Sequence, residues 1–161
     1  MDKMTTELNI MIDGLKRKSD ALMEILSITE NQRTVIESEL PIDEVRNIIF
    51  QMNEGKQEAI KIVRSCDDMF EAMLKDMGAE LEARQDDFKP QVAKMQEGIR
   101  RVMDYDVKIR VGEEENNRLL DEKRGEIPTV SGGIKPKTTP VPLSPVKVAK
   151  AYEEGQKNYK G

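Results

Sequence analysis

The chain has 161 residues, of which 35% are charged and 37% are hydrophobic, and 31 acidic against 26 basic side chains give a net charge of −5. It has no histidine and one cysteine, which excludes a histidine dyad, an imidazole metal site, an intrachain disulfide and a thiolate zinc cluster. The mild acidity argues against wholesale nucleic-acid binding. We therefore expect no enzyme, no cofactor and no metal site. The start of the chain has no signal-peptide pattern and no window resembles a membrane span, so we expect a cytoplasmic protein.

Residues 5–39 are predicted to form one long amphipathic helix, because apolar residues such as Leu8, Leu15 and Leu22 recur at steps of three and four. The apolar stripe loses its character at Thr29 and Gln32. Gly14 lies inside this pattern and costs about 1 kcal/mol relative to alanine. We therefore expect the first turns of this helix to be weak.

Two prolines divide the rest of the helical pattern. Pro41 ends the first helix, and Asp43 and Glu44 favour a new helix N-terminus directly after it. The second helix is predicted over residues 43–88, with a stop anywhere from residue 78 to residue 88. Pro90 either kinks one very long helix or opens a third one over residues 89–123, and the pattern leaves both alternatives open.

The character of the sequence changes after Gly125. Residues 126–146 hold five of the seven prolines and are predicted to be an extended linker, and residues 147–161 a short C-terminal helix. Residues 126–161 carry a net charge of +3 and residues 1–125 a net charge of −8, which permits weak docking of the tail on the body. The predicted fold is thus all-α: a long antiparallel hairpin or bundle of two to three amphipathic helices in residues 1–125, the Pro-rich linker and the short helix.

Ten methionines are the most informative feature for function. Met69, Met73 and Met77 form a line at helical spacing beside Phe70, and Met95 and Met103 are placed to face them. Unbranched methionines adapt to irregular partners, so a Met-lined groove suits binding of varied apolar helices. Ordinary core packing is the alternative, and the two interpretations can overlap. A thin hairpin also leaves apolar surface for self-association or for a client.

The cysteine and the paired carboxylates are expected to have no chemical role. Cys66 falls on an apolar stripe position, which indicates a buried inert thiol. Paired carboxylates such as Asp67 and Asp68 lie on charge-rich helix faces, where solvation is the ordinary outcome. Neither pattern predicts catalysis.

Several stretches together resemble a known family. The first is LMEILSITENQ at residues 22–32. The second is a proline-started helix with Lys56, Gln57, Ile60 and Val63, which runs into Cys-Asp-Asp-Met-Phe at 66–70. The others are KPQVAKMQEGIRRVMDYDVKI at 89–109, followed by Asn117, Leu119 and Leu120, and AYEEGQKNYKG at the end of the sequence. The arrangement resembles flagellar export chaperones of the FliT/FlgN type, and FliT-like proteins most. The sequence does not decide between these two.

The resemblance implies a cytoplasmic type III export chaperone. Such proteins bind the amphipathic C-terminal helix of a flagellar filament-cap or hook-associated protein, prevent premature assembly and deliver it to the export machinery. For this sequence, the resemblance implies a partner-binding groove lined by Met69, Phe70, Met73, Met77, Ile99, Val102 and Met103. It also implies a regulatory C-terminal helix that presents Val148, Tyr152 and Tyr159. The alternative is a structural coiled-coil scaffold or adaptor that assembles with itself.

Overall fold

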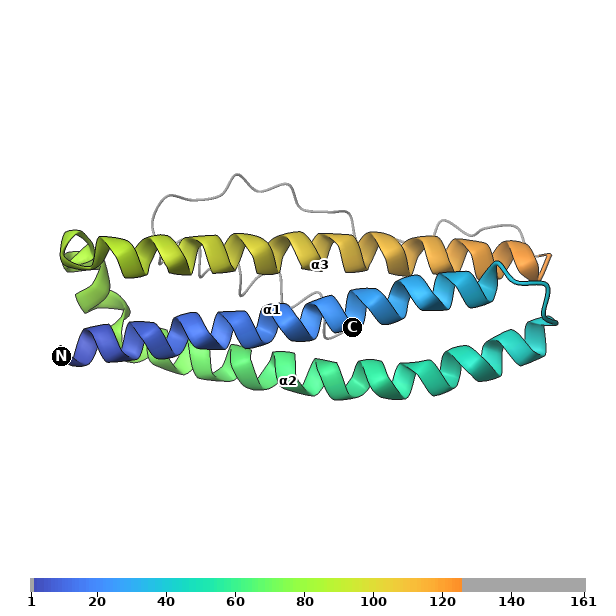
Figure 1. The fold of residues 1–161 in the computed structure, drawn as a ribbon, viewed down its shortest axis with the longest axis horizontal. Helices are drawn as coiled ribbons and strands as arrows, with labels where there is room; N and C mark the ends of the chain where they lie inside the picture. Colours follow the sequence, from blue (N-terminus) through green and yellow to red (C-terminus); the bar gives the residue numbers. More distant parts are fainter. Residues whose placement is uncertain (1, 126–161) are drawn as a thin grey trace.

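The computed structural model describes residues 2–125, which form three long α-helices and one short 3₁₀ helix (Figure 1). The elements are α1 (Lys3–Ile36), α2 (Ile42–Ala83), η1 (Gln85–Phe88) and α3 (Lys89–Lys123). No strand occurs among the described residues, so the predicted all-α class is confirmed for this part of the chain. The predicted linker (126–146) and C-terminal helix (147–161) lie outside the described residues.

Helix α1 runs without a break from Lys3, contrary to the expectation of weak first turns. Asp2 caps it, because its side chain accepts a hydrogen bond of 3.1 Å from the backbone N–H of Met4. A Cβ added at Gly14 would collide with the terminal methyl of Met69 on α2. Gly14 therefore has a packing role that the helix propensity alone does not indicate.

The junction between α2 and α3 decides the question that Pro90 left open. Helix α2 ends at Ala83, inside the predicted window, and η1 reverses the chain before Pro90 stands in the first turn of α3. Pro90 thus opens a third helix over the predicted range. The Arg84 guanidinium lies 3.0 Å from Glu80, 3.3 Å from Asp87 and 3.2 Å from Asp2, so the start of α1 is tied to this turn.

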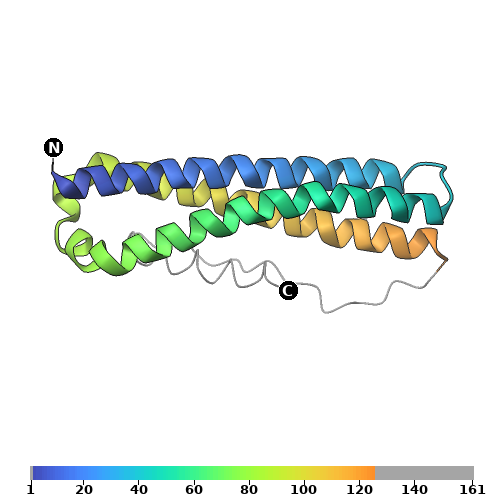
Figure 2. The same cartoon turned by 90° about the horizontal axis from the view of Figure 1, so that it is seen from below.

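Helix α1 is the centre of the bundle. It packs along both α2 and α3, whereas the backbones of α2 and α3 hardly approach one another. In Figure 1 α1 lies between the other two helices, and the turned view in Figure 2 shows that all three run side by side along the molecule. A Cβ added at Gly98 or Gly112 of α3 would lie 3.2 Å from Cδ1 of Leu15 and 2.9 Å from Cγ2 of Thr29, respectively. These two glycines allow α3 to approach α1 closely.

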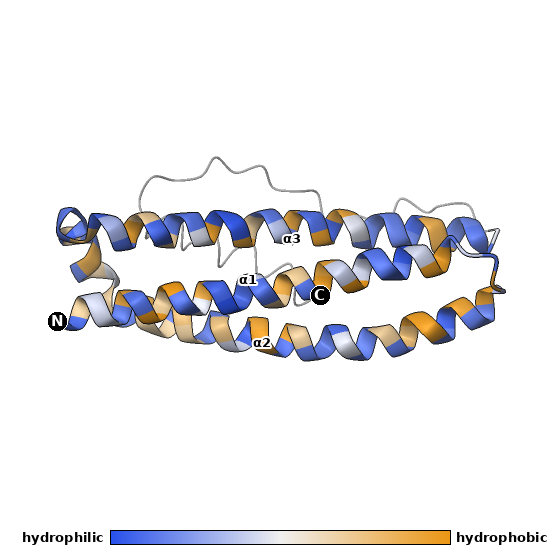
Figure 3. Cartoon of the chain, in the orientation of Figure 1, coloured by the Kyte–Doolittle hydropathy of each residue, from blue (hydrophilic) through white to orange (hydrophobic). Residues whose placement is uncertain are grey.

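The interior changes in chemistry along the bundle. One apolar cluster joins the three helices and includes Leu8, Leu22, Phe70, Met95 and Ile99. Beyond Ile25 of α1 the buried side chains include Thr29 and Gln32, and the predicted loss of apolar character is confirmed there. Figure 3 shows apolar and polar stretches alternating along every helix, as expected for amphipathic elements. None of the described helices is apolar enough over a sufficient length to span a membrane.

Candidate helix-binding face

The seven residues of the predicted groove occupy two environments. Phe70, Met77, Ile99 and Val102 are buried in the apolar cluster, and the partly exposed Met73 and Met103 pack against it. Met69 is also partly exposed, and its methyl group lies against Gly14 of α1. The structure thus brings six of the seven residues into one cluster, with Met73 and Met103 at its edge. Their part in partner binding stays a prediction, as does that of Val148, Tyr152 and Tyr159, which lie outside the described residues.

A further set of partly exposed residues borders the space between α2 and α3. On α2, Ile60, Asp67 and Leu74 recur every seven residues and therefore share one flank. Lys56, one turn before Ile60, forms an ion pair with Glu113 of α3, so this flank is turned towards α3. On α3, Gln96, Met103 and Arg110 recur in the same way, opposite the flank that carries Gly98 and Gly112. We call these six residues, Ile60, Asp67, Leu74, Gln96, Met103 and Arg110, the α2/α3 face.

A largely buried cluster of four charges adjoins this face. Lys18 of α1 binds Asp67 of α2 at 2.6 Å, and Arg110 binds Asp106 of α3 at 2.8 Å. Burial lowers the pKa of Lys18 to about 8, and the charge of Asp67 offsets part of that effect. Burial also raises the pKa of Asp106, against the opposing effects of Arg110 and Lys18. The cluster is balanced in charge but strongly desolvated.

The sequence interpretation missed the role of Lys18 and Arg110. A signal for Lys18 was present, because it stands three residues after Leu15 and four before Leu22, on the apolar stripe itself. A charged residue at such a position predicts either a local break in the apolar stripe or a buried partner of opposite charge. No comparable signal marks Arg110, since its burial depends on how α3 is turned against α2.

A second polar layer crosses the bundle nearer the α1–α2 connection. Thr29 Oγ1 donates to the carbonyl of Ile25 at 2.8 Å, and Asn116 Nδ2 donates to the carbonyl of Thr29 at 3.0 Å. Gln32 donates to Asn53 at 2.8 Å, which links α1 to α2. These hydrogen bonds pair most of the buried polar groups of the layer, whereas Oδ1 of Asn116 is buried without a partner.

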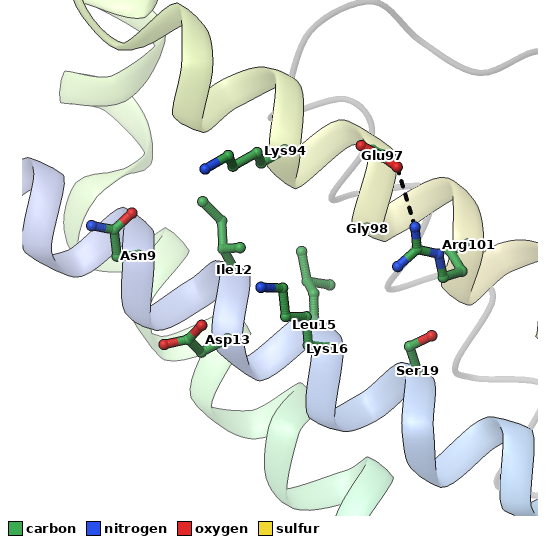
Figure 4. Close-up of a pocket in the computed structure, with 10 residues that line it drawn as sticks. All are labelled: Asn9, Ile12, Asp13, Leu15, Lys16, Ser19, Lys94, Glu97, Gly98 and Arg101. Atoms are coloured by element: carbon green, nitrogen blue, oxygen red, sulfur yellow. Dashed lines mark hydrogen bonds and ion pairs between the residues drawn. The ribbon is translucent and has the colours of Figure 1, made fainter.

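A surface depression of about 480 Å³ lies between α1 and α3 (Figure 4). Leu15 and Gly98 line it, and Arg101, also in the lining, binds Glu97 at 3.2 Å. The other lining residues are Asn9, Ile12, Asp13, Lys16, Ser19 and Lys94. Because the lining carries both signs of charge, it does not favour one class of charged ligand.

Cys66 is buried, and desolvation raises the pKa of its thiol. Its burial agrees with the predicted stripe position. Within residues 2–125 no group of three His, Cys, Asp or Glu side chains is placed to hold a metal ion.

The chain matches no protein-family model, no curated protein and no solved structure. The resemblance to flagellar export chaperones therefore rests on the sequence motifs alone, and the functional assignment is a proposal.

Proposed function

We propose that this protein is a helix-binding chaperone that takes an amphipathic helix of another protein on the α2/α3 face. One observation carries this proposal: α1 packs along both neighbours, whereas α2 and α3 hardly approach one another and leave apolar side chains partly exposed between them. A fourth helix laid there would cover Ile60, Leu74 and Met103. Apolar area removed from water is the main driving force for such binding.

The finer assignment is a type III export chaperone of the flagellum. The client would be the amphipathic C-terminal helix of a filament-cap or hook-associated protein, held in the cytoplasm and kept from premature assembly before it reaches the export machinery. The stretches at residues 22–32, 66–70 and 89–109 support this assignment through their resemblance to FliT-like chaperones. The mixed chemistry of the α2/α3 face also suits an amphipathic client better than a wholly apolar one.

The C-terminal segment 147–161 is proposed to cover the same face when no client is bound. Val148, Tyr152 and Tyr159 would be its apolar contacts, because aromatic rings with a polar tip suit a face that is partly wet. The basic tail and the acidic body attract one another. A client would then compete with the tail, and the tail would regulate access.

Co-purification from a flagellated cell tests the assignment. The full chain should recover a filament-cap or hook-associated protein, identified by mass spectrometry, and Met103→Asp should lose it. Met23→Asp is the matched control, because Met23 is an exposed methionine of α1. Recovery of no flagellar subunit, or equal recovery by both variants, would count against the assignment.

A structural scaffold is the second candidate. Large apolar side chains outside the α2/α3 face are also exposed, with Phe50 at 70% and Val111 at 52%. Such residues on other flanks favour self-association more than they favour a single client. Light scattering separates the two candidates, because a scaffold stays a higher oligomer in the presence of client and a chaperone does not.

A further inference from the structure

Helix α3 carries exposed apolar residues at the middle of its outer side. Val107 and Val111 are 36% and 52% exposed, and Met103, four residues before Val107, is partly exposed. Residues four apart are neighbours on a helix, so these three residues form one apolar line. Val107 stands about two and a half turns after Gly98, which contacts α1, so the line is turned away from α1. It adjoins the α2/α3 face at Met103.

Two exposed charges of opposite sign flank this line. Arg100 stands seven residues before Val107 and Glu114 seven residues after it, and seven residues are nearly two turns, so the three share one side of α3. Neither charged side chain has an ion pair or a hydrogen bond within residues 2–125. The other arginines of α3 each bind a carboxylate of the same helix, namely Arg101, Arg110 and Arg118. Arg100 and Glu114 are therefore available to a partner.

The charges of α3 are complementary about Val107. Wherever two charged residues of α3 stand at equal distances before and after Val107, their signs are opposite: Asp106 and Lys108, Asp104 and Arg110, Arg101 and Glu113, and Arg100 and Glu114. A helix that packs antiparallel on its own copy around Val107 brings residues at equal distances opposite one another. Such a contact thus meets no like charge in α3, and complementary charge of this kind fixes the partner and its register.

We propose that a second copy of this chain binds along this line, with its α3 antiparallel to the first and the two-fold axis at Val107. Met103 then packs on the partner's Val111, and Arg100 pairs with the partner's Glu114. Because the contact is isologous, each of these contacts occurs twice, and the assembly closes as a dimer. A single pair of helices is a small interface, so the dimer forms weakly and reversibly. The contact itself does not depend on the proposed chaperone function.

Met103 connects the dimer contact with the α2/α3 face. A client helix that covers Met103 removes the apolar contact for the partner's Val111, so the client and the second copy compete. The dimer is then the form of the protein without a client, and its exposed valines stay covered until a client binds. This consequence rests on the proposed function.

Charge reversal followed by sedimentation velocity tests the contact. The full chain at low ionic strength should show a monomer–dimer equilibrium over a range of concentrations. Arg100→Glu and Glu114→Arg should each raise the dissociation constant of the dimer about tenfold, because each replaces two attractions by two repulsions. The double variant Arg100→Glu/Glu114→Arg keeps the net charge of the wild type and restores both pairs with exchanged signs. Its dissociation constant should return to within about threefold of the wild-type value.

A mixture of the two single variants gives the most specific outcome. In their mixed dimer the glutamate introduced at position 100 faces the arginine introduced at position 114, and the native Arg100 faces the native Glu114. The mixture should therefore dimerise about tenfold more tightly than either variant alone. Damage to the fold of either variant cannot produce this gain.

Lys94→Glu is the matched control. Lys94 is an exposed cation of α3 that lines the depression beside α1, and its reversal changes the net charge by the same amount as Arg100→Glu. It should change the dissociation constant less than about twofold. Circular dichroism checks that all variants keep the helicity of the wild type.

Three results would overturn the inference. They are a wild type that stays monomeric up to about 1 mM, single variants that behave as Lys94→Glu does, and a mixture that dimerises no better than its components. In a parallel contact each residue would face its own copy, so the single variants would be no weaker than the wild type. Client recovery with Met103→Asp tests the chaperone proposal separately, and that proposal stands if only the dimer contact is refuted.

Discussion

Lys18 of α1 and Asp67 of α2 form an ion pair of 2.6 Å whose side chains are only 4% and 11% exposed. The pair joins two helices at a point where apolar residues fill the positions before and after Lys18 on the stripe. Desolvation of both groups opposes much of their attraction, so the pair contributes little net stability, whereas either charge left alone is strongly destabilising.

The first prediction concerns the removal of this pair. Lys18→Met should lower the free energy of unfolding by about 3–5 kcal/mol, because it leaves the Asp67 carboxylate without its partner. The double variant Lys18→Met/Asp67→Leu should recover most of that loss. Urea denaturation of the three proteins measures both effects. A double variant no more stable than Lys18→Met would show that the pair is not the reason for the loss.

The pH dependence of stability follows from the lowered pKa of Lys18. At neutral pH Lys18 is charged in the folded and the unfolded chain, so the full burial penalty applies. Between pH 8 and 10.5 the folded Lys18 loses its proton first, and the unfolded state binds more protons, so stability from this group rises with pH. The wild type should gain up to about 3 kcal/mol relative to Lys18→Met across this range. A difference that stays constant from pH 7 to pH 10.5 would contradict the assignment.

Two glycines in helices should respond to alanine in opposite directions. A methyl group at Gly112 would lie 2.9 Å from Cγ2 of Thr29, so Gly112→Ala should push α3 from α1 and destabilise by about 1–3 kcal/mol. A methyl group at Gly78 meets nothing within 4 Å, and Gly78→Ala should stabilise by about 0.5–1 kcal/mol. Thermal unfolding of the two variants checks the contrast, and a stabilised Gly112→Ala would refute the close packing of α1 and α3.

Removal of the tail tests whether it covers the binding face. Deletion of residues 146–161 should leave the helicity nearly intact, because α1, α2 and α3 are held by contacts among themselves. Client affinity should rise, since the client no longer competes with the tail. Circular dichroism and titration calorimetry give the two quantities. A weaker client affinity after deletion would make the tail part of the binding surface.

The helices and their limits were largely predictable from the sequence. Steps of three and four between apolar residues predict α1 and α2, and Pro41 and Pro90 place the breaks because proline suits the first turn of a helix. The end of α2 at Ala83 was less certain, since Gly78 does not end the helix and η1 continues the chain to Phe88.

The arrangement of the helices was not predictable in the same way. Gly98 and Gly112 allow α3 to lie close to α1, and Gly14 is in contact with the end of the Met69 side chain, but a single glycine in a sequence does not reveal which neighbour it admits. The buried charges of Lys18 and Arg110 depend in turn on this arrangement. The predicted groove residues were chosen by periodicity, which finds the apolar cluster but does not separate its buried centre from its exposed edge.

The most direct test of the account compares two methionines in a binding measurement. The probe is a labelled peptide of the C-terminal helix from the client recovered by co-purification, titrated with the full chain and followed by fluorescence anisotropy. Met103→Asp should weaken binding at least about tenfold, because it places a charge at the centre of the α2/α3 face, while both variants keep their helicity. Met23→Asp, at an exposed methionine of α1, should change binding less than about twofold. Equal affinities of the two variants, or a larger loss with Met23→Asp, would contradict the proposal that a client helix binds between α2 and α3.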